Sequence, residues 1–468
     1  MLFNSLHFLI FFPIILILYF CTPHKYRWMI LLAGSYYFYM SWKAEYIILI
    51  MISTLVDYIA GIQIDKAITK KKKKIFLGLS LATNLGLLFA FKYFNFFSDS
   101  VRALLSQFAI PLDPITLKVL LPVGISFYTF QTLSYTIDVY RGKIKPEKHL
   151  GIFAVYVSFF PQLVAGPILR AHDFLPQFYI EHKFEYVKAV SGARLMLWGF
   201  FKKLVIADGV AITANIVFNN PGDYSGPYLI LATVFFAIQI YCDFSGYSDI
   251  AIGAARMMGF DIMQNFRAPY LSKSIGEFWK RWHISLSSWF KDYVYIPLGG
   301  NRVKVGRWYI NILIVFIVSG LWHGAAFGFL IWGLLHGLYL IIEIILKNVT
   351  GKIKINHYAK RFICIGYTFI LVNIGWVFFR SNNLSDAIYI LTHTFTNVSD
   401  IIVGGVLIFI IIFILFISDL MYSNEKIRLY LKRLRGIGFI RWLFYIFIIL
   451  TIAIFGITKG LPFVYFQF

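Results

Sequence analysis

The chain has 468 residues, of which 59% are hydrophobic and only 14% are charged, and its formal net charge is +22. A soluble domain is about half apolar and about a quarter charged, so this composition excludes an ordinary soluble protein. The apolar residues form long runs, which are typical of helices in lipid, whereas a membrane β-barrel would alternate apolar and polar residues. The sequence therefore predicts an all-α polytopic membrane protein.

Thirteen apolar segments are candidates for membrane spans, judged against the about 20 residues that cross a bilayer. In chain order they are 4–21, 27–43, 46–64, 76–94, 116–138, 150–168, 191–207, 227–247, 308–322, 326–346, 361–379, 403–420 and 438–457. Basic residues follow the first segment and do not precede it, which is the wrong polarity for a cleaved signal peptide. We therefore expect the first segment to be a span that begins outside.

The positive charge lies in five short clusters between these segments, as the positive-inside rule requires of cytoplasmic loops. The clusters are Lys66 with 70–74, then 141–148, 273–307, 347–361 and 426–435. Membrane topology thus accounts for the charge, and no binding to nucleic acid is expected. The three cysteines, Cys21, Cys242 and Cys364, have no metal-binding spacing, so neither a disulfide framework nor a zinc site is expected.

Charge parity requires an even number of crossings between 149 and 273, where three candidates occur. We predict that 150–168 is re-entrant, because Pro161 and Pro167 break the helix there. Broken backbone at membrane depth is tolerated where protein or a water-filled cavity covers it. About twelve crossings of roughly 20 residues remain, and both termini are then external.

The chain is predicted to form a single membrane domain over 1–468, since no internal repeat is present. Within it we distinguish N-terminal spans (1–115), a core (116–346) and C-terminal spans (347–468). An inverted-repeat transporter would have broken helices in both halves, and only one broken segment is evident.

The stretch 277–296 is predicted to be one amphipathic helix at the cytoplasmic interface, ended by Pro297 and two glycines. Its inward face is formed by residues at three- and four-residue steps: Trp279, Trp282, His283, Leu286 and Phe290. The other side carries charges: Lys280, Arg281, Lys291 and Asp292. His283 is either an interfacial histidine satisfied by a carbonyl or a functional residue, and the pattern alone does not decide between them.

His323 lies in the motif Trp322-His323-Gly324, deep in an apolar region. An ionisable residue at that depth is a functional-site candidate by default, and the alternative is a histidine that hydrogen-bonds between helices. On one continuous helix His336 would be about 20 Å away, so the pair does not chelate one metal unless the chain reverses between them. General-base chemistry by one histidine is therefore favoured over a metal site, and His336 is expected to be supporting or structural.

Further polar residues fall within apolar segments, where pairs of them are often structural. They are Gln131, Asp138, Gln162, Arg194, Asp243, Asp249 and Glu343. The sequence has no Gly-x-Ser-x-Gly elbow and no phosphate-binding glycine loop, so neither a serine hydrolase nor an ATP-driven pump is supported.

Six stretches together resemble the membrane-bound O-acyltransferases, most closely the bacterial branch with the alginate and peptidoglycan O-acetyltransferase membrane subunits. They are 121–141, 160–167, 241–249, 278–300, 320–324 and 463–468. The resemblance implies a helical bundle around a tunnel through the membrane, with His323 in the central catalytic role and His283 at the second family position. We expect supporting or tunnel-lining positions at Trp322, His336, Gln131, Asp138, Gln162, Asp243 and Tyr293.

The resemblance also implies a mechanism. A cytoplasmic thioester donor, acetyl-CoA, enters near 277–296, where Lys280, Arg281 and Lys291 hold its phosphates. His323 acts as general base or orients the acceptor, and His283 polarises the thioester or positions the donor. The acetyl group leaves on the external side, where a separate periplasmic esterase-like transferase fixes it to a sugar hydroxyl. Tyr465 is either an acyl relay or a residue of the interfacial aromatic belt.

The chain is thus expected in the bacterial cytoplasmic (inner) membrane, with no cofactor besides the acyl thioester co-substrate. Peptidoglycan is the acceptor we favour, and O-acetylation of alginate-like exopolysaccharide and D-alanylation of teichoic acid are alternatives. Two readings from other classes are a solute transporter or flippase, and a scaffold that recruits a periplasmic partner. The lack of paired broken helices disfavours the first, and the buried His323 disfavours the second.

Overall fold

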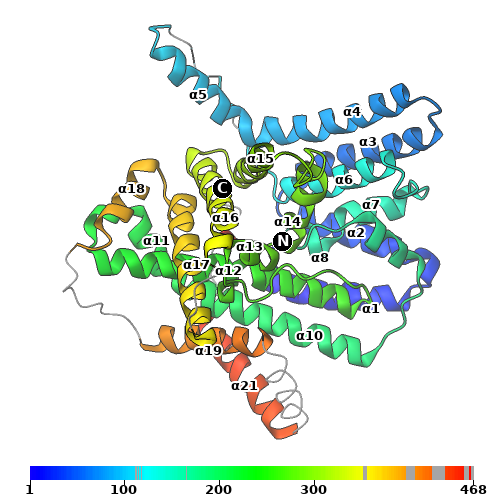
Figure 1. Cartoon of the computed structure of the whole chain (residues 1–468). Helices are drawn as coiled ribbons and strands as arrows, with labels where there is room; N and C mark the ends of the chain where they lie inside the picture. Colours follow the sequence, from blue (N-terminus) through cyan, green and yellow to red (C-terminus); the bar gives the residue numbers. More distant parts are fainter. Residues whose placement is uncertain are drawn as a thin grey trace. The chain divides into compact units, whose positions relative to one another are not determined.

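The computed structural model describes residues 1–110, 113, 115–117, 119–164, 166–350, 356–396, 406–423, 438–457 and 463–464. Within these residues the chain is helical and contains no strand, which confirms the all-α prediction. It divides into two compact units (Figure 1). The first comprises Met1–Met196 and Ser248–Met263, and the second comprises Leu197–Tyr247 and Gln264–Phe468.

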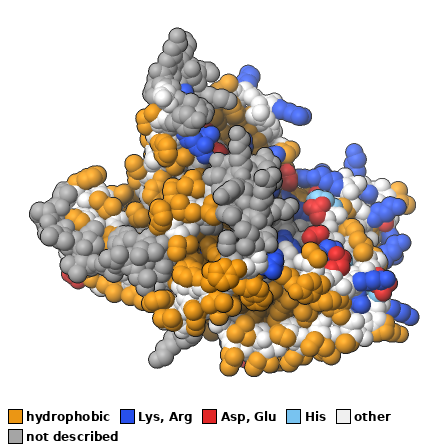
Figure 2. Space-filling view, turned by 90° about the horizontal axis from the view of Figure 1, so that it is seen from below, with side chains coloured by type: hydrophobic (Ala, Val, Ile, Leu, Met, Phe, Trp, Pro, Cys, Tyr) orange, Lys and Arg blue, Asp and Glu red, His pale blue; other side chains and the backbone are white. Residues whose placement is uncertain are grey.

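Six helices among the described residues are long and apolar enough to cross a membrane: Ala44–Lys66, Lys70–Ser106, Gly226–Met257, Val305–His323, Phe327–Leu346 and Ala359–Arg380. Four shorter apolar helices accompany them: Leu6–Cys21, Leu150–Leu163, Ile412–Met421 and Arg441–Phe455. Many of their large apolar side chains are exposed, and apolar side chains cover much of the face seen in Figure 2. Such a surface is suited to lipid, so the chain is a multi-pass membrane protein.

The first unit contains most of the N-terminal helices. They are α1 (Leu6–Cys21), α2 (Arg27–Met40), α3 (Ile47–Lys66), α4 (Lys70–Leu88), the π-helical turn η3 (Phe89–Tyr93), α5 (Phe94–Ser106), α6 (Ile125–Tyr140), α7 (Leu150–Ser158), α8 (Phe160–Leu163) and α9 (Ala171–Phe174). The lysines at 70–74, predicted to lie in a loop, instead form the first turns of α4. The helix begins there because the side chain of Thr69 accepts a hydrogen bond from the backbone N–H of Lys72 and caps it.

The predicted break in 150–168 is present. The chain leaves the helical conformation at Phe159, between α7 and α8, and Pro161 lies in the first turn of α8, where proline costs no helical hydrogen bond. The backbone N–H of Phe160 donates to Ser35 Oγ at 3.1 Å. The broken backbone is thus buried and hydrogen-bonded within the first unit, as a break at membrane depth requires.

The second unit contains η5 (Lys202–Ala207), α11 (Asp208–Asn219), α13 (Ile275–Arg281), α14 (Ile284–Phe290), η8 (Lys291–Tyr295), α15 (Val305–His323), α16 (Phe327–Thr350), α17 (His357–Arg380), α18 (Leu384–His393), α19 (Val406–Ser423) and α21 (Gly438–Phe455). Two helices have residues in both units, α10 (Tyr186–Phe201) and α12 (Gly226–Met257). The core of the second unit is rich in tryptophan, with Trp282, Trp332 and Trp376 at most 1% exposed. This aromatic core surrounds the predicted histidines.

A buried polar network joins α3, α4 and α6 in the first unit. Asp57 is fully buried and accepts hydrogen bonds from Asn84 Nδ2 at 2.7 Å, from Thr136 Oγ1 at 2.8 Å and from Ser80 Oγ. Asn84 in turn accepts a hydrogen bond from Ser53 Oγ at 2.6 Å. Such bonds connect helices where apolar contact with a neighbour is no better than contact with lipid. The sequence analysis did not single out Asp57, although a carboxylate in an apolar run is a usable signal.

We expect Asp57→Ala to lower the stability of the purified protein by about 1–3 kcal/mol, because three buried donors lose their acceptor. The change is measured as a lower melting temperature in detergent. Asp99→Ala is the matched control, since that carboxylate is half exposed and pairs only with Arg102 on its own helix. Equal melting temperatures for the two variants would show that the network does not stabilise the bundle.

Candidate functional site

α15 and α16 form a tight antiparallel hairpin that carries His323 and His336. A Cβ atom on Gly320 would lie 2.2 Å from the carbonyl oxygen of Phe329, and one on Gly333 would lie 2.3 Å from that of Phe316. The two backbones touch where the glycines lie, as in other closely packed membrane helices. The chain therefore reverses between the two histidines, and the separation expected for one continuous helix does not apply.

His323 is the last residue of α15 and is 3% exposed. Its ring contacts Trp322 and Trp332, each at 4.9 Å between centroids, and Phe379 at 5.3 Å, all close to edge-on. Residues of α15, α16 and α17 thus enclose the imidazole in aromatic rings. An imidazole at this position is shielded from bulk water by aromatic side chains.

His283 lies at a break that the sequence analysis did not predict. The single helix predicted over 277–296 is wrong, because α13 ends at Arg281 and α14 begins at Ile284. Between them His283 has φ 42° and ψ 56°, a left-handed conformation that is costly for a residue with a side chain. Asn265 holds the break: its carbonyl oxygen accepts from Ile284 N at 2.9 Å and its Oδ1 accepts from Ser285 N at 3.2 Å.

The inward face predicted for this stretch is nevertheless correct. Its residues are buried at 3% exposure or less, apart from the partly buried Trp279: Trp282, His283, Leu286 and Phe290. Burial lowers the pKa of His283 from its ordinary 6.5 to about 3. The side chain is therefore neutral at physiological pH.

Trp322 lies between the two predicted catalytic histidines. Its ring is 5.9 Å from that of His283 and 4.9 Å from that of His323. His283 also meets Phe244 of α12 edge-on at 4.6 Å. The second unit thus brings together three predicted site residues from two segments that lie forty positions apart in the sequence.

His336 is fully buried on α16, one turn beyond Trp332. Its Nδ1 accepts a hydrogen bond from Trp279 Nε1 at 3.3 Å, and its ring contacts Trp332 at 5.1 Å. Trp332 thus contacts both His323 and His336. Among the residues described, no group of three or more His, Cys, Asp or Glu could hold a metal ion, and the three cysteines form no disulfide there.

A buried ion triad lies near this site in the second unit. Lys203 Nζ is 2.8 Å from both Asp208 Oδ1 and Asp243 Oδ1, and Asp243 Oδ2 accepts from the backbone N–H of Val464 at 2.7 Å. The sequence analysis named Asp243 but missed Lys203 and Asp208, although charges at one end of the apolar run 191–207 were a visible signal. The triad places one ammonium group between two carboxylates, and Asp243 also holds the backbone of Val464.

The C-terminal segment reaches the wall of the site. Phe463 is fully buried and packs on Phe244 at 5.7 Å and on Tyr247 at 4.7 Å. Phe244 is the residue that contacts His283. Tyr465, the predicted relay or belt residue, lies outside the described residues.

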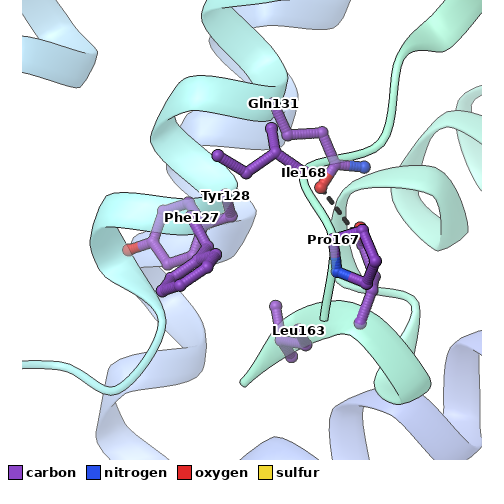
Figure 3. Close-up of a pocket in the computed structure, with 7 residues that line it drawn as sticks. Phe127, Tyr128, Gln131, Leu163, Pro167 and Ile168 are labelled. Atoms are coloured by element: carbon purple, nitrogen blue, oxygen red, sulfur yellow. Dashed lines mark hydrogen bonds between the residues drawn. The ribbon is translucent and has the colours of Figure 1, made fainter. Parts of the chain in front are cut away.

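Three predicted supporting residues belong to the first unit. Gln162 Nε2 donates to Gln131 Oε1 at 2.5 Å, and Gln131 Nε2 donates to the carbonyl of Tyr156 at 2.5 Å. Both glutamines line a small pocket, in which Figure 3 shows Gln131 beside Pro167 and Ile168. The remaining lining residues are Phe127, Tyr128 and Leu163. The third supporting residue, Asp138, lies 3.6 Å from Lys143 Nζ.

The three predicted phosphate-binding residues differ in availability. Lys280 and Lys291 are exposed, whereas Arg281 pairs with Glu277 at 2.6 Å. Burial would raise the pKa of the Glu277 carboxyl, but the Lys273 amide and Arg281 outweigh it and lower that pKa. The guanidinium of Arg281 is therefore already engaged in an ion pair within the protein. Tyr293 is partly buried, with its ring 5.0 Å from that of Trp289.

The low pKa of His283 predicts a loss of stability in acid. The folded protein keeps this side chain neutral down to about pH 3, whereas the unfolded chain protonates near 6.5. The contribution of this side chain to the free energy of unfolding is therefore fully present above pH 6.5. Below pH 6.5 that contribution decreases by about 1.4 kcal/mol per pH unit. We expect the melting temperature of wild type to fall more between pH 7.5 and 5 than that of His283→Asn, which does not titrate and tolerates the left-handed conformation. Parallel pH profiles would contradict this assignment.

Comparison with known proteins identifies the family of the chain. The model of the MBOAT, membrane-bound O-acyltransferase family, matches residues 145–385, which include His283, His323 and His336. A protein named probable alginate O-acetylase from Pseudomonas putida is 43% identical over 388 residues, covering 82% of this chain and 78% of that protein. The peptidoglycan O-acetyltransferase of Helicobacter pylori is 35% identical over 391 residues, covering 78% of this chain and 72% of that protein.

A third relative, the teichoic acid D-alanyltransferase of Bacillus subtilis, is 31% identical over 231 residues, covering 47% of this chain and 58% of that protein. The names of these relatives share one reaction class, the transfer of an acyl group to a polymer outside the cytoplasm. The family match covers about half of the chain and the identities extend over most of it. The chain therefore belongs to the membrane-bound O-acyltransferase family and is a membrane-embedded acyltransferase.

Proposed function

We propose that this enzyme takes an acetyl group from acetyl-CoA on the cytoplasmic side of the bacterial inner membrane and delivers it outward for O-acetylation of an extracytoplasmic polysaccharide. The observation that carries the proposal is the placement of His283 and His323 on either side of Trp322, buried among aromatic rings. A histidine pair buried away from bulk water is suited to acyl transfer, because water in such a site would hydrolyse the thioester.

In the proposed reaction His323 is the general base. It takes the proton of the attacking hydroxyl while that oxygen bonds to the thioester carbonyl carbon. The C–S bond then breaks, and the imidazolium returns its proton to the leaving thiolate. His283 orients the thioester carbonyl or donates a hydrogen bond to it. Its neutral state at physiological pH supports this role, since a neutral imidazole carries one N–H donor.

Lys280 and Lys291 are the proposed contacts for the phosphates of the donor. Both are exposed, and both flank the break at which His283 turns into the core. Arg281 contributes to the shape of this region through its bond to Glu277. Ammonium groups bind phosphate as point charges.

Tyr465 is the proposed carrier of the acetyl group on its way outward. The two residues that directly precede it in the chain, Phe463 and Val464, are buried and held by Phe244 and Asp243. This neighbourhood in the sequence is what supports the choice of Tyr465. Its phenol oxygen would take the acetyl group in the first transfer and release it to the acceptor, or to a periplasmic esterase-like partner, in the second.

The identities favour a secreted, alginate-like polysaccharide as the acceptor. The chain is 43% identical to the probable alginate O-acetylase and 35% identical to the peptidoglycan O-acetyltransferase, over similar lengths. Peptidoglycan, preferred from the sequence alone, stays a prediction. Mass spectrometry of secreted and wall-bound glycans, with and without the protein, separates the two acceptors.

We expect His323→Ala to abolish acetylation while the protein still accumulates in the membrane, because the transfer loses its base. The loss should exceed about 10²-fold, the lower range for general-base catalysis. The measurement is the acetyl content of envelope glycans in cells carrying each variant. His172→Ala is the control, since that histidine is solvent-exposed in the first unit. Undiminished acetylation would favour a transporter or scaffold function.

The double variant Lys280→Ala, Lys291→Ala should raise the KM for acetyl-CoA several-fold and leave kcat nearly unchanged, because exposed charges bind the donor in its ground state. The KM of wild type should also rise with salt more steeply than that of the variant. Lys71→Ala, at an exposed lysine of α4, is the control. A fall in kcat with constant KM would contradict the assignment of these two lysines to binding of the donor phosphates.

A further inference from the structure

One indole N–H group and one imidazole N–H group are buried on α16. Neither has an acceptor among the described residues. Trp332 Nε1 is one, and it can only donate. His336 Nε2 is the other. Because Trp279 Nε1–H donates to His336 Nδ1, that nitrogen carries no proton, and a neutral His336 must hold its proton on Nε2. Both groups are therefore donors.

Both side chains are fully buried, so water at the protein surface does not satisfy these donors. A buried donor without an acceptor costs about 1–3 kcal/mol. Trp332 and His336 are one turn apart on the same face of α16, with ring centroids at 5.1 Å. Two unsatisfied donors on side chains in contact are suited to an oxygen ligand, which has two lone pairs to accept them.

Gly375 of α17 packs directly against the side of these rings that carries the donors. A Cβ atom on Gly375 would lie 2.9 Å from His336 Nε2 and 3.3 Å from Trp332 Cδ1. Any side chain at this position would therefore press on the Nε2 donor and on the edge of the indole ring next to Nε1. Glycine therefore keeps a side chain off this side of both rings.

The donors also lie next to the proposed catalytic base. The Trp332 ring that carries one donor is 4.9 Å from the ring of His323 and 5.1 Å from that of His336. The indole of Trp332 thus contacts both the imidazole of the proposed base and that of His336. This is the relation between base and oxyanion donors that acyl transfer requires.

We propose that Trp332 Nε1–H and His336 Nε2–H form the oxyanion site that binds the carbonyl oxygen of the acetyl group. The inference rests on the proposed function and assigns His336, predicted to be only supporting, to direct contact with the substrate. When the nucleophile attacks the carbonyl carbon, the π electrons of the C=O bond move onto this oxygen. The two N–H groups stabilise that charge, and the electrons return as the C–S bond breaks.

The test uses the full-length purified protein with acetyl-CoA labelled with ¹³C at the carbonyl. Trp332→Phe keeps an aromatic ring in the core but removes one donor, and we expect kcat to fall about 10²-fold with little change in KM. Gly375→Ala keeps both donors but places a methyl group on them, and we expect a similar fall. The infrared carbonyl band of the bound acetyl group should lie at lower frequency in wild type than in Trp332→Phe.

Two matched controls isolate the donors from general effects of the substitutions. Trp308→Phe removes an indole N–H that already donates to Tyr295. Gly366→Ala introduces a methyl group on the same helix as Gly375, at a position with no atom within 4 Å. Both should retain wild-type kcat.

The proposal is overturned if Trp332→Phe and Gly375→Ala keep wild-type kcat and the carbonyl band does not shift. If instead both variants only lower the melting temperature, with kcat and the band unchanged, the donors hold an ordered water and the proposal is again wrong. Failure of the proposed function has a different signature, because wild type itself would then transfer no acetyl group from acetyl-CoA.

Discussion

A polar group in the interior of this protein has no bulk water to bind, so it must find its partner within the protein. This constraint explains why Asp57 is surrounded by three hydroxyl and amide donors and why Lys203 lies between two aspartates. The same constraint is the reason we propose a ligand for the two N–H donors on α16 that have no acceptor among the described residues. Polar groups that are paired within the protein stabilise the fold, and we infer that the two donors without such a partner bind the substrate.

The helices and their apolar faces were predictable, because long apolar runs and a 3.6-residue period are local properties of the chain. The break at His283 was not. The apolar period continues through Trp282, His283 and Leu286, and the left-handed turn depends on hydrogen bonds to Asn265, about twenty positions away. Similarly, the close approach of α15 and α16 depends on Gly320 and Gly333, whose roles appear only when the two helices are packed together.

The candidate site was predicted in part. His323 follows from an ionisable residue in an apolar run, whereas its pairing with His283 came from the resemblance to a family. Lys203 and Asp208 were not predicted, because polar residues were considered singly and not as opposite charges that pair in the fold. The separation of His336 from His323 was expected along one continuous helix. The structure instead reverses the chain between α15 and α16 and places Trp332 against both imidazoles.

The central claim is that acyl transfer takes place among His283, Trp322 and His323 in the interior of the second unit. A structure of the protein with a stable acetyl-CoA analogue, in which a methylene replaces the thioester sulfur, tests it most directly. The account predicts that the acetyl carbonyl carbon lies within about 4 Å of an imidazole nitrogen of His323, near-attack range for a base and its reacting group. It also predicts that the coenzyme phosphates lie toward Lys280 and Lys291. An acetyl group bound away from both histidines would contradict the account.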